Sequence, residues 1–428
     1  MRVYLDSVGC KLNQSEIEKY AAQFHRAGHE MVARVEDADI YVLNTCAVTA
    51  AASSDSRQKL RQAVHQNPEI QIIATGCLVS LDQSIQQVIP QITRLVPNDQ
   101  KDTLVQDLLG ELPDLEYYER QAIPGSRQRT RAFIKVQDGC DNFCTFCVTR
   151  LARGVSRSMD SRQVLNDIQG ALAGGAREVV LTGVHLASYG MELTPKSSLA
   201  DLISAILKEV PENVRIRVSS LEPWDMTPEF FDLWEDPRLC PHFHLPLQSG
   251  SDAVLRRMAR KIHTGDYVSL VEAILTRLPD AAITTDVIVG FPGETEAEFM
   301  ESLAFIQRIP FAGGHVFSYS VREKTAAARM HGQVHGSIKK ARSKILREVF
   351  NGQAERYHAR FVGKNVQVLW ESARKVAGGY LLSGLTPNYV RVDALNPQAF
   401  HNQYSVVSVE KADVRCCWGT IVTPARRE

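Results

Sequence analysis

Three cysteines close together form the strongest chemical signal in this sequence. Cys140, Cys144 and Cys147 stand in the run Cys-Asp-Asn-Phe-Cys-Thr-Phe-Cys. Three thiolates on one short loop can hold three irons of a 4Fe-4S cube, because the iron–sulfide core prefers cysteine ligands. A structural zinc site usually has four ligands, and no nearby histidine supplies a fourth here. We therefore predict a cluster with one iron open to an outside ligand, with zinc or three incidental thiols as the alternatives.

Three further cysteines are dispersed, but each one closely follows a predicted strand. Cys10 comes after strand residues 2–6, Cys46 after residues 40–44, and Cys77 after residues 70–75. The carboxyl ends of parallel strands meet at one edge of a sheet, where open α/β sheets bind ligands. The placement favours a second cluster, again with one open iron, over three scattered buried thiols. The leftover Cys240, Cys416 and Cys417 are expected to be core or surface thiols.

The composition excludes several classes of protein. The 428 residues are 44% hydrophobic and 23% charged, which is ordinary for packed globular domains and unlike a fibre or a disordered chain. The odd cysteine number, nine, suits reduced thiols better than a disulfide framework. No apolar run approaches the ~20 residues that span a bilayer, and charge appears at the start before a signal-peptide core. The protein is expected to be soluble and cytoplasmic.

The N-terminal elements predict an open parallel α/β sheet that positions the dispersed cysteines. The three strands alternate with amphipathic segments at residues 15–27 and 53–66, for which Ser15 and Ser53 are candidate N-caps. Residues 101–119 carry one Lys and six acidic residues, whereas residues 120–162 carry nine Lys and Arg and three acidic residues. This change of charge predicts a first domain over residues 1–118.

The rest of the chain predicts two further domains. Residues 126–360 contain six strand–helix units, which indicate a partial (β/α)6 barrel whose working face lies at the carboxyl ends of its strands. The strands are expected at residues 133–136, 178–182, 215–219, 242–247, 283–289 and 314–319. Residues 361–428 consist of short β-like runs separated by Gly, Pro and Asn, which predict a small β-barrel used as a binding module.

With these features together, the sequence resembles the radical S-adenosylmethionine (SAM) methylthiotransferase family over nearly its whole length. The resemblance implies a methylthiotransferase domain, a radical-SAM barrel and a C-terminal RNA-binding TRAM domain. It rests on a series of short motifs in order: VGCKLN at 8–13, NTCAVT at 44–49, TGC at 75–77, the loop at 140–147, LTGVH at 181–185, LPLQSGS at 245–251 and DVIVGFPGE at 286–294.

One branch of the family is favoured by the residues around Cys10. Gly-Cys-Lys-Leu-Asn-Gln at 9–14 resembles the branch that acts on N6-threonylcarbamoyladenosine at tRNA position 37. The isopentenyladenosine branch tends to have Gln-Met-Asn after the Gly-Cys, and the ribosomal-protein branch Pro-Lys-Asn. The last two substrates are therefore the alternatives. One departure is visible: Lys324 replaces a family glycine, which could have permitted a positive φ.

The resemblance implies the cofactors and the chemistry. Carbon-2 of adenine carries an unactivated C–H bond, so a radical is required and the protein mainly holds the cofactors. The 4Fe-4S cluster on Cys140, Cys144 and Cys147 would bind SAM and deliver an electron, giving methionine and a 5′-deoxyadenosyl radical. The second 4Fe-4S cluster would carry the sulfur, and a second SAM would methylate it. The implied partners are the tRNA anticodon stem-loop and an electron donor such as flavodoxin or ferredoxin, with the enzyme expected to be a monomer.

Candidate SAM contacts follow the barrel strands. Gly183 lies where backbone could approach the methionine amino group, and Ser220 and Gln248 could reach the ribose or carboxylate. Val289 and Gly290 could pack near the adenine. Turn geometry or core packing is the alternative for each residue. His242 and His244 alternate on one strand and are expected to form hydrogen bonds inside the barrel rather than to bind metal.

A basic segment flanks the first barrel strand and its cysteine loop. Clustered positive charge beside an active face favours phosphate contact, although a solvated charged linker is the alternative and the whole chain is neutral. The candidate RNA-binding residues are Arg131, Lys135, Arg150, Arg153 and Arg157, together with Arg127 and Arg129. A non-catalytic RNA-binding protein with zinc or a structural cluster is the rival class, which iron and sulfide analysis would distinguish.

Overall fold

The computed structural model describes residues 1–113, 116–124 and 130–423. They form two compact units. The first unit contains the described residues up to 124 with Ala132–Phe143 and Cys147–Glu209, and the second contains Cys144–Phe146 and the described residues from Val210 on, with Thr130 and Arg131. The predicted central domain is therefore shared between the units, and the boundary predicted around residues 118–126 falls partly outside the described residues.

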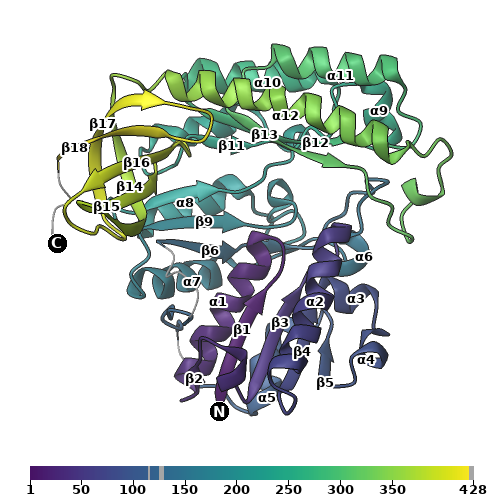
Figure 1. Ribbon diagram of the computed structural model, residues 1–428, viewed down its shortest axis with the longest axis vertical. Coiled ribbons are helices and arrows are strands. Elements are labelled where there is room, and N and C mark those ends of the chain that lie inside the picture. The colour runs from purple at the N-terminus through teal and green to yellow at the C-terminus, as the bar shows by residue number, and fades with distance from the viewer. Residues whose placement is uncertain (114–115, 125–129, 424–428) are drawn as a thin grey trace. The chain divides into compact units, whose positions relative to one another are not determined.

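The first unit begins with a five-stranded parallel sheet (Figure 1), as the sequence predicts. Its strand order is β2 (Glu30–Met31), β1 (Arg2–Ser7), β3 (Ile40–Thr45), β4 (Gln71–Gly76) and β5 (Ile92–Val96). Ile40 and Val42 of β3 pack into one hydrophobic cluster, and Tyr41 and Leu43 into another. Since alternate residues of a strand point to opposite faces, the sheet is covered on both sides and β3 is central.

The helices of this domain start directly after the cysteine loops. Helix α1 (Lys11–Arg26) has Cys10 as its N-cap residue, and α2 (Ala50–Gln66) is capped by Thr49, whose side chain accepts from the Ala52 N–H. The predicted caps Ser15 and Ser53 are wrong, because both serines are buried one turn inside their helices. The shorter elements are η1 (Val35–Asp37), α3 (Cys77–Leu81), α4 (Ile85–Val88), η2 (Lys101–Thr103) and α5 (Leu104–Leu109).

Further strands and helices of the first unit carry the start of the barrel. They are β6 (Arg131–Lys135), the antiparallel pair β7 (Gln137–Asp138) and β8 (Arg157–Ser158), α6 (Thr149–Arg153), α7 (Ser161–Ala173), β9 (Glu178–Thr182), η3 (Leu186–Ser188) and α8 (Leu199–Glu209). The bounds of β9 agree with those expected from the sequence. The close-spaced cysteine loop lies between β7 and α6.

The second unit continues the strand–helix alternation. Strands β11 (His242–His244), β12 (Ala282–Val289) and β13 (Gly313–Ser318) form a parallel sheet, preceded by β10 (Arg215–Val218). The helical elements are η4 (Pro223–Asp225), η5 (Pro228–Glu235), α9 (Asp252–Arg257), α10 (Thr264–Arg277), α11 (Glu296–Arg308), η6 (Ala327–Arg329) and α12 (Gly336–Ala359). Along the chain, β6, β9, β10, β11, β12 and β13 are six strands in the order that the (β/α)6 prediction requires.

A closed five-stranded β-barrel ends the described chain, as expected. Its order is β14 (Asn365–Val376), β15 (Gly379–Leu385), β16 (Arg391–Asn396), β18 (Cys417–Thr423) and β17 (Tyr404–Ala412). Trp370 is fully buried in its core and donates from its indole nitrogen to the Ser405 hydroxyl. Cys416 and Cys417 are buried as well. Within the described residues, no helix is long and apolar enough to cross a bilayer.

Candidate metal centres

The dispersed cysteines lie at the carboxyl ends of three neighbouring parallel strands. Cys10, Cys46 and Cys77 follow β1, β3 and β4, which are adjacent in the sheet. A Cβ added at Gly9 would lie 2.6 Å from both Cβ and Sγ of Cys46, so the Cys10 loop passes directly against Cys46. Cys10 is exposed, whereas Cys46 and Cys77 are buried. The chain thus gathers three soft thiol ligands at one edge of the sheet.

Hydrogen bonds fasten the three strand ends to one another. The Asn13 side chain is fully buried, and its Nδ2 donates to the carbonyls of Val8 at 2.8 Å and Thr45 at 3.0 Å. The hydroxyl of Thr45 in turn donates to the Thr75 carbonyl at 2.6 Å. These carbonyls lie one or two residues before the three cysteines, so the positions of the cysteines are linked in series.

Two glycines make the turns before these cysteines possible. Gly9 and Gly76 both have a φ of 97°, in the left-handed region that other residues rarely adopt. Each glycine stands immediately before a cysteine of the set. A Cβ on Gly76 would come within 2.4 Å of the Thr45 carbonyl oxygen. The close approach of the neighbouring chain at both positions, together with the positive φ, explains why a glycine precedes Cys10 and Cys77.

The donor set fits a cluster with three cysteine ligands. Burial raises the pKa of the Cys46 thiol to about 11, so this cysteine is protonated at neutral pH until iron displaces the proton. Cys10 is the N-cap of α1, and Cys77 is the first residue of α3. Within the described residues, no three His, Cys, Asp or Glu side chains already surround a common metal position. We therefore identify Cys10, Cys46 and Cys77 as ligands by their position at one edge of the sheet.

The second cysteine set lies in the loop after β7. The backbone N–H groups of Asn142 and Thr149 point to the sulfurs of Cys140 and Cys147, each at 3.4 Å. Such contacts favour thiolates, the form that binds iron. Cys140 and Cys147 belong to the first unit and Cys144 to the second. All three are partly exposed, and a three-cysteine loop of this kind also fits a 4Fe-4S cluster.

Within the second unit, Arg260 is the cation beside Cys144. Its Nη1 lies 3.7 Å from the Cys144 sulfur, and its Nη2 donates to Glu222 at 2.8 Å. The guanidinium also lies over the Trp224 ring, 4.2 Å from the centroid. Arg260 is therefore held in one place next to a cluster ligand, a role that the sequence did not reveal.

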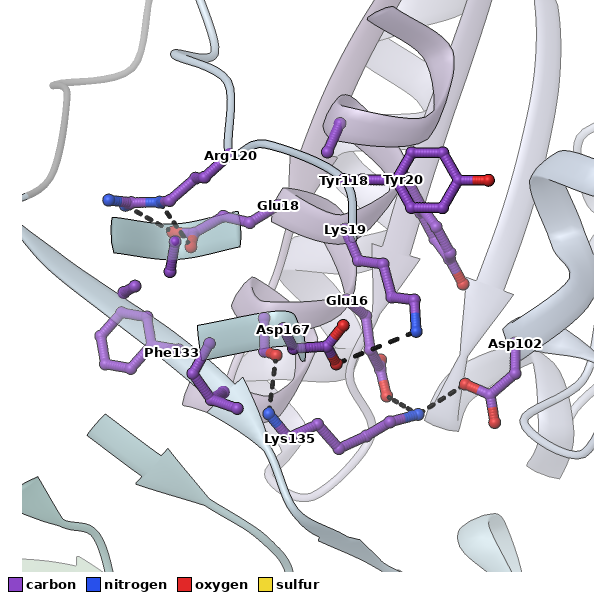
Figure 2. Close-up of a pocket in the computed structure, with 15 residues that line it drawn as sticks. Glu16, Glu18, Lys19, Tyr20, Asp102, Tyr118, Arg120, Phe133, Lys135 and Asp167 are labelled. Atoms are coloured by element: carbon purple, nitrogen blue, oxygen red, sulfur yellow. Dashed lines mark hydrogen bonds and ion pairs between the residues drawn. The ribbon is translucent and has the colours of Figure 1, made fainter. Parts of the chain in front are cut away.

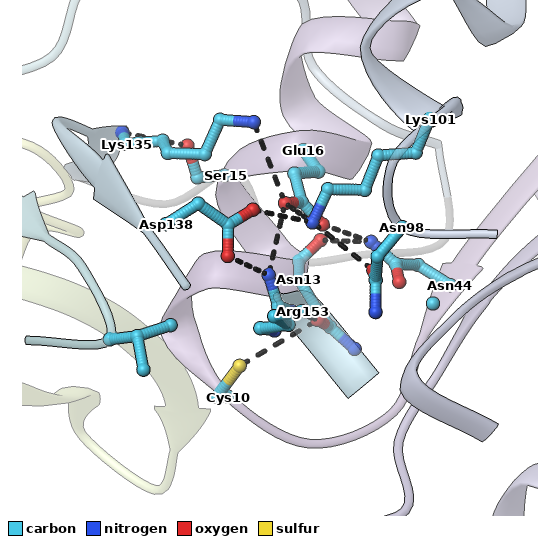
Figure 3. A network of polar contacts seen from close by, with 12 residues as sticks. Cys10, Asn13, Ser15, Glu16, Asn44, Asn98, Lys101, Lys135, Asp138 and Arg153 are labelled. Atoms are coloured by element: carbon cyan, nitrogen blue, oxygen red, sulfur yellow. Dashed lines mark hydrogen bonds and ion pairs between the residues drawn. The ribbon is translucent and has the colours of Figure 1, made fainter. Parts of the chain in front are cut away.

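Within the first unit, a buried network of charged groups connects α1, β7 and α6 with Lys101 (Figure 3). Lys101 is fully buried, with its Nζ 2.5 Å from Glu16 and 2.8 Å from Asp138. Arg153 completes the network, 2.9 Å from Asp138. Burial alone would raise the pKa of Glu16, but the attraction of Lys101, Arg153 and Lys135 outweighs it and lowers the pKa. Arg153 and Lys101 likewise outweigh burial and lower the pKa of Asp138, so both carboxylates stay ionised in the interior.

Replacing Lys101 by methionine should destabilise the first unit strongly. The substitution would leave two buried carboxylates short of one cation, and breaking a buried ion pair on one side typically costs about 3–5 kcal/mol. Thermal unfolding of the purified chain measures the loss. The matched control is Lys344→Met, which removes a lysine whose side chain is 80% exposed and 3.9 Å from Glu348. Equal midpoints for the two variants would show that the network adds no stability.

A small cavity lies beside the network, between α1 and β6 (Figure 2). Its volume is about 70 Å³, and its lining includes Lys19, Asp102, Lys135 and Asp167. Ligand pockets usually measure roughly 300–1,000 Å³, so this cavity is too small for SAM or a nucleoside. We therefore exclude it as the substrate site.

The candidate SAM contacts are divided between the units. Gly183 follows β9 in the first unit, where the Gln137 side chain accepts from the next two backbone N–H groups. Ser220, Gln248, Val289 and Gly290 all belong to the second unit. Val289 is 1% exposed, which agrees with packing as well as with an adenine contact. The assignment of these five residues to SAM stays a prediction.

Gln248 has a strained backbone, with a φ of 77°. Left-handed conformations of non-glycine residues cost roughly 1–2 kcal/mol and cluster at functional sites. Lys324, by contrast, has no positive φ, so replacement of the family glycine does not strain that turn.

Gln248→Gly tests whether this strain serves SAM binding. The substitution relieves the strain and removes the side chain, so we expect an unfolding midpoint no lower than that of the wild type and weaker SAM binding in equilibrium dialysis. Asn402→Gly, at another position of positive φ (57°), is the control and should leave SAM affinity unchanged. Unaltered SAM affinity in Gln248→Gly would remove this residue from the SAM site.

Two of the predicted RNA contacts need correction. Lys135 and Arg153 are 6% and 4% exposed and pair with buried carboxylates, so a phosphate cannot reach them. Arg131 pairs with Glu371 at 2.7 Å and is partly exposed, so it stays a candidate with Arg150 and Arg157. Arg127 and Arg129 lie outside the described residues. The histidine prediction is confirmed, since His242 and His244 both lie within hydrogen-bond distance of the Thr284 hydroxyl.

Comparison with known proteins agrees with this arrangement. Residues 2–96 match a family described as "Uncharacterized protein family UPF0004", and residues 134–306 match the radical SAM superfamily. A radical SAM methyltransferase, TsrM from Kitasatospora setae, shares the fold with a TM-score of 0.55 at 13% identity, covering 76% of this chain and 77% of that one.

Relatives with full-length similarity are tRNA-modifying enzymes. The threonylcarbamoyladenosine tRNA methylthiotransferases MtaB of Bacillus subtilis and Thermotoga maritima are 35% and 37% identical, covering 91% and 88% of this chain and 89% of each relative. A tRNA-2-methylthio-N(6)-dimethylallyladenosine synthase of Clostridium tetani is 31% identical over 87% of this chain and 86% of the relative.

The chain therefore belongs to the radical-SAM tRNA methylthiotransferase family. It is a transferase whose cofactors are SAM and two 4Fe-4S clusters, as the two cysteine sets predict. Its substrate is a tRNA, in keeping with the relatives.

Proposed function

We propose that this enzyme adds a methylthio group to carbon-2 of N6-threonylcarbamoyladenosine at position 37 of tRNA, next to the anticodon. The observation that carries the proposal is the set of three dispersed cysteines, Cys10, Cys46 and Cys77, at the edge of the N-terminal sheet. A radical-SAM enzyme with one cluster can activate a C–H bond, but a sulfur insertion also needs a place to hold the sulfur. The edge with Cys10, Cys46 and Cys77 supplies that place.

Two observations support the proposed substrate base. The relatives named for threonylcarbamoyladenosine are 33–37% identical, against 30–31% for those named for dimethylallyladenosine. The residues after Cys10 are Lys-Leu-Asn, which resemble the same branch.

Bound at these sites, the clusters and SAM would supply one-electron cleavage of SAM and transfer of a methylated sulfur, with two SAM molecules consumed in each turnover. The chain's own residues hold the ligands and set their surroundings. Asn13 and Thr45 fix the strand ends that carry the dispersed cysteines. Arg260 places a positive charge beside Cys144.

Exposed groups near the cysteine loop suit a single-stranded RNA substrate. Phe143 is 72% exposed, and the Arg150 guanidinium lies over its ring, 4.1 Å from the centroid. Unstacked bases of RNA loops bind by stacking on aromatic rings and arginine planes. Arg157 is exposed nearby in the sequence and could contact phosphate. The C-terminal barrel, with its TRAM-like architecture, would add general RNA affinity.

The proposal extends to the setting of the reaction. The substrate is the anticodon stem-loop, and a flavodoxin or ferredoxin would provide the electrons. We place the enzyme in the cytoplasm, as a monomer.

Mass spectrometry of tRNA nucleosides from cells with and without the gene tests the substrate. We expect loss of 2-methylthio-N6-threonylcarbamoyladenosine and accumulation of N6-threonylcarbamoyladenosine in the deletion strain, with rescue by the gene. Loss of only the methylthio-isopentenyl nucleoside would refute the proposed base and leave the family assignment intact. No change in either nucleoside would refute both tRNA substrates and direct the search to a ribosomal protein.

A further inference from the structure

We propose that Arg153 is a positioning residue of the cluster on Cys10, Cys46 and Cys77, joining the sheet edge that carries this cluster to the segment before Cys140. The inference rests on the proposed function, because it assumes that the sheet edge holds a cluster. It goes further by assigning a role to a buried arginine that contributes no cluster ligand.

The guanidinium of Arg153 has two close partners, and a third, the Glu16 carboxylate, lies farther away at 3.5 Å. Nη2 lies 2.6 Å from the Asn13 side-chain oxygen, and Nη1 lies 2.9 Å from the Asp138 carboxylate. The residue is 4% exposed, and all these groups belong to the first unit. Figure 3 shows the side chain lying between Asn13 and Asp138. A planar guanidinium with several donors can bridge two acceptors in this way, whereas a lysine ammonium is a single point charge.

Both partners are themselves anchors for cysteine loops. Asn13 donates to the carbonyls of Val8 and Thr45, which precede Cys10 and Cys46. Asp138 accepts from the N–H of Gly139, the residue immediately before Cys140. Arg153 therefore holds Asn13, which fixes the residues before Cys10 and Cys46. It also holds Asp138, which fixes the residue before Cys140.

The third cysteine of the edge is reached through the residue before Arg153. The Asn98 side-chain nitrogen donates to the Ala152 carbonyl at 2.7 Å and lies 3.7 Å from the Cys77 sulfur. Lys101 donates to the oxygen of the same amide at 3.2 Å, which fixes its orientation. The end of α6 thus contacts the surroundings of all three edge cysteines.

The charge of Arg153 should also act on the cluster. Burial would lower the pKa of Arg153, but the negative charges of Cys77, Glu16 and Asp138 raise it well above its usual value. A fixed positive charge close to an iron–sulfur cluster stabilises the reduced form, which is more negative. Removing the charge should therefore make this cluster harder to reduce.

The test uses the full chain with Cys140, Cys144 and Cys147 all replaced by alanine, so that only the edge cluster gives a signal. Into this background we introduce Arg153→Met, Arg153→Lys and the control Arg162→Met. Arg162 is a comparable arginine whose side chain is 83% exposed. Each protein is reconstituted with iron and sulfide. The readouts are bound iron, the midpoint potential from an EPR-monitored redox titration, and the rate of iron loss to a chelator.

Arg153→Met should shift the midpoint potential to more negative values and release iron at least roughly tenfold faster, since outer-shell partners of metal ligands commonly contribute 10–100-fold to affinity. Arg153→Lys keeps the charge but cannot bridge both partners, so its potential should stay near that of the parent while iron loss is still faster. Arg162→Met should match the parent in both readouts.

The outcomes separate the inference from the proposed function. If the parent protein binds no cluster at the edge, the proposed function fails with the cofactor site. If the parent binds a cluster but Arg153→Met and Arg153→Lys match Arg162→Met in potential and iron loss, the positioning role is refuted alone. Should Arg153→Met not fold, Arg153→Lys decides the question through the rate of iron loss.

Discussion

Alanine in place of Cys46 is expected to abolish methylthiolation of tRNA while SAM cleavage continues. Cys46 lies on the central strand's end and would supply one of three ligands at the sheet edge, and two thiols hold a cluster poorly. The cysteines at 140, 144 and 147 remain, so 5′-deoxyadenosine should still form from SAM under reducing conditions. Nucleoside mass spectrometry measures the product, and iron analysis should show about half of the wild-type content, as for one cluster in place of two.

Cys240→Ala is the matched control for this substitution. Cys240 is also buried, at 1% exposure, but it belongs to neither cysteine set. The Cys240→Ala variant should therefore retain full iron content and product formation. Full iron content in Cys46→Ala would contradict the assignment of this cysteine as a ligand, and product formation without the edge cluster would contradict the proposed source of the sulfur.

Alanine in place of Gly76 should prevent the edge cluster from assembling. The backbone at this position has a φ of 97°, which costs an L-residue roughly 1–2 kcal/mol. In addition, the new Cβ would lie 2.4 Å from the Thr45 carbonyl and 2.5 Å from the Asn44 side-chain oxygen. The Thr45 carbonyl is a backbone group, so it cannot move without shifting the residue before Cys46. We expect loss of about half of the bound iron and a lower unfolding midpoint, the clash adding about 1–3 kcal/mol.

Gly28→Ala separates the two effects at Gly76. Gly28 has a similar φ of 80°, but an added Cβ there meets nothing within 4 Å. It should lose some stability from backbone strain and keep both clusters. Equal iron content in the two variants would show that the contact between residues 45 and 76 does not govern the cysteine geometry.

Much of the candidate site could be predicted because its signals are local in sequence. Strands β1, β3 and β4 stand out as apolar runs, and each leads within one to three residues to a cysteine. Parallel topology then brings the three cysteines to one edge without any knowledge of side-chain contacts. The C-terminal barrel was predicted for a similar reason, since its short strands are separated by turn residues.

The polar surroundings of the cysteines could not be predicted in the same way. Lys101, Glu16 and Asp138 come from separate parts of the chain, and each one alone has the sequence pattern of an ordinary surface charge. Their burial depends on tertiary packing, which a single sequence does not record. The same limitation made Lys135 and Arg153 look like phosphate-binding residues, because a basic segment is usually solvated unless folding supplies buried acidic partners.

Helix starts were mispredicted for a related reason. Serine is a good N-cap in general, but α1 begins at Lys11, immediately after a cysteine that the strand end places there. The position of Cys10 at the end of β1 therefore decides where α1 begins, and the capping preference of serine does not. The short turns at Gly9 and Gly76 likewise serve to place a cysteine at the edge of the sheet.

The different spacing of the two cysteine sets has a consequence for how the enzyme matures. The loop at residues 140–147 keeps its thiols close in any conformation, so it can gather iron before the chain has folded. Cys10, Cys46 and Cys77 meet only when β1, β3 and β4 have paired, because closing the long intervening segments costs entropy that the folded sheet has already overcome. Damage anywhere in that sheet would therefore yield a half-matured enzyme that consumes SAM without modifying tRNA.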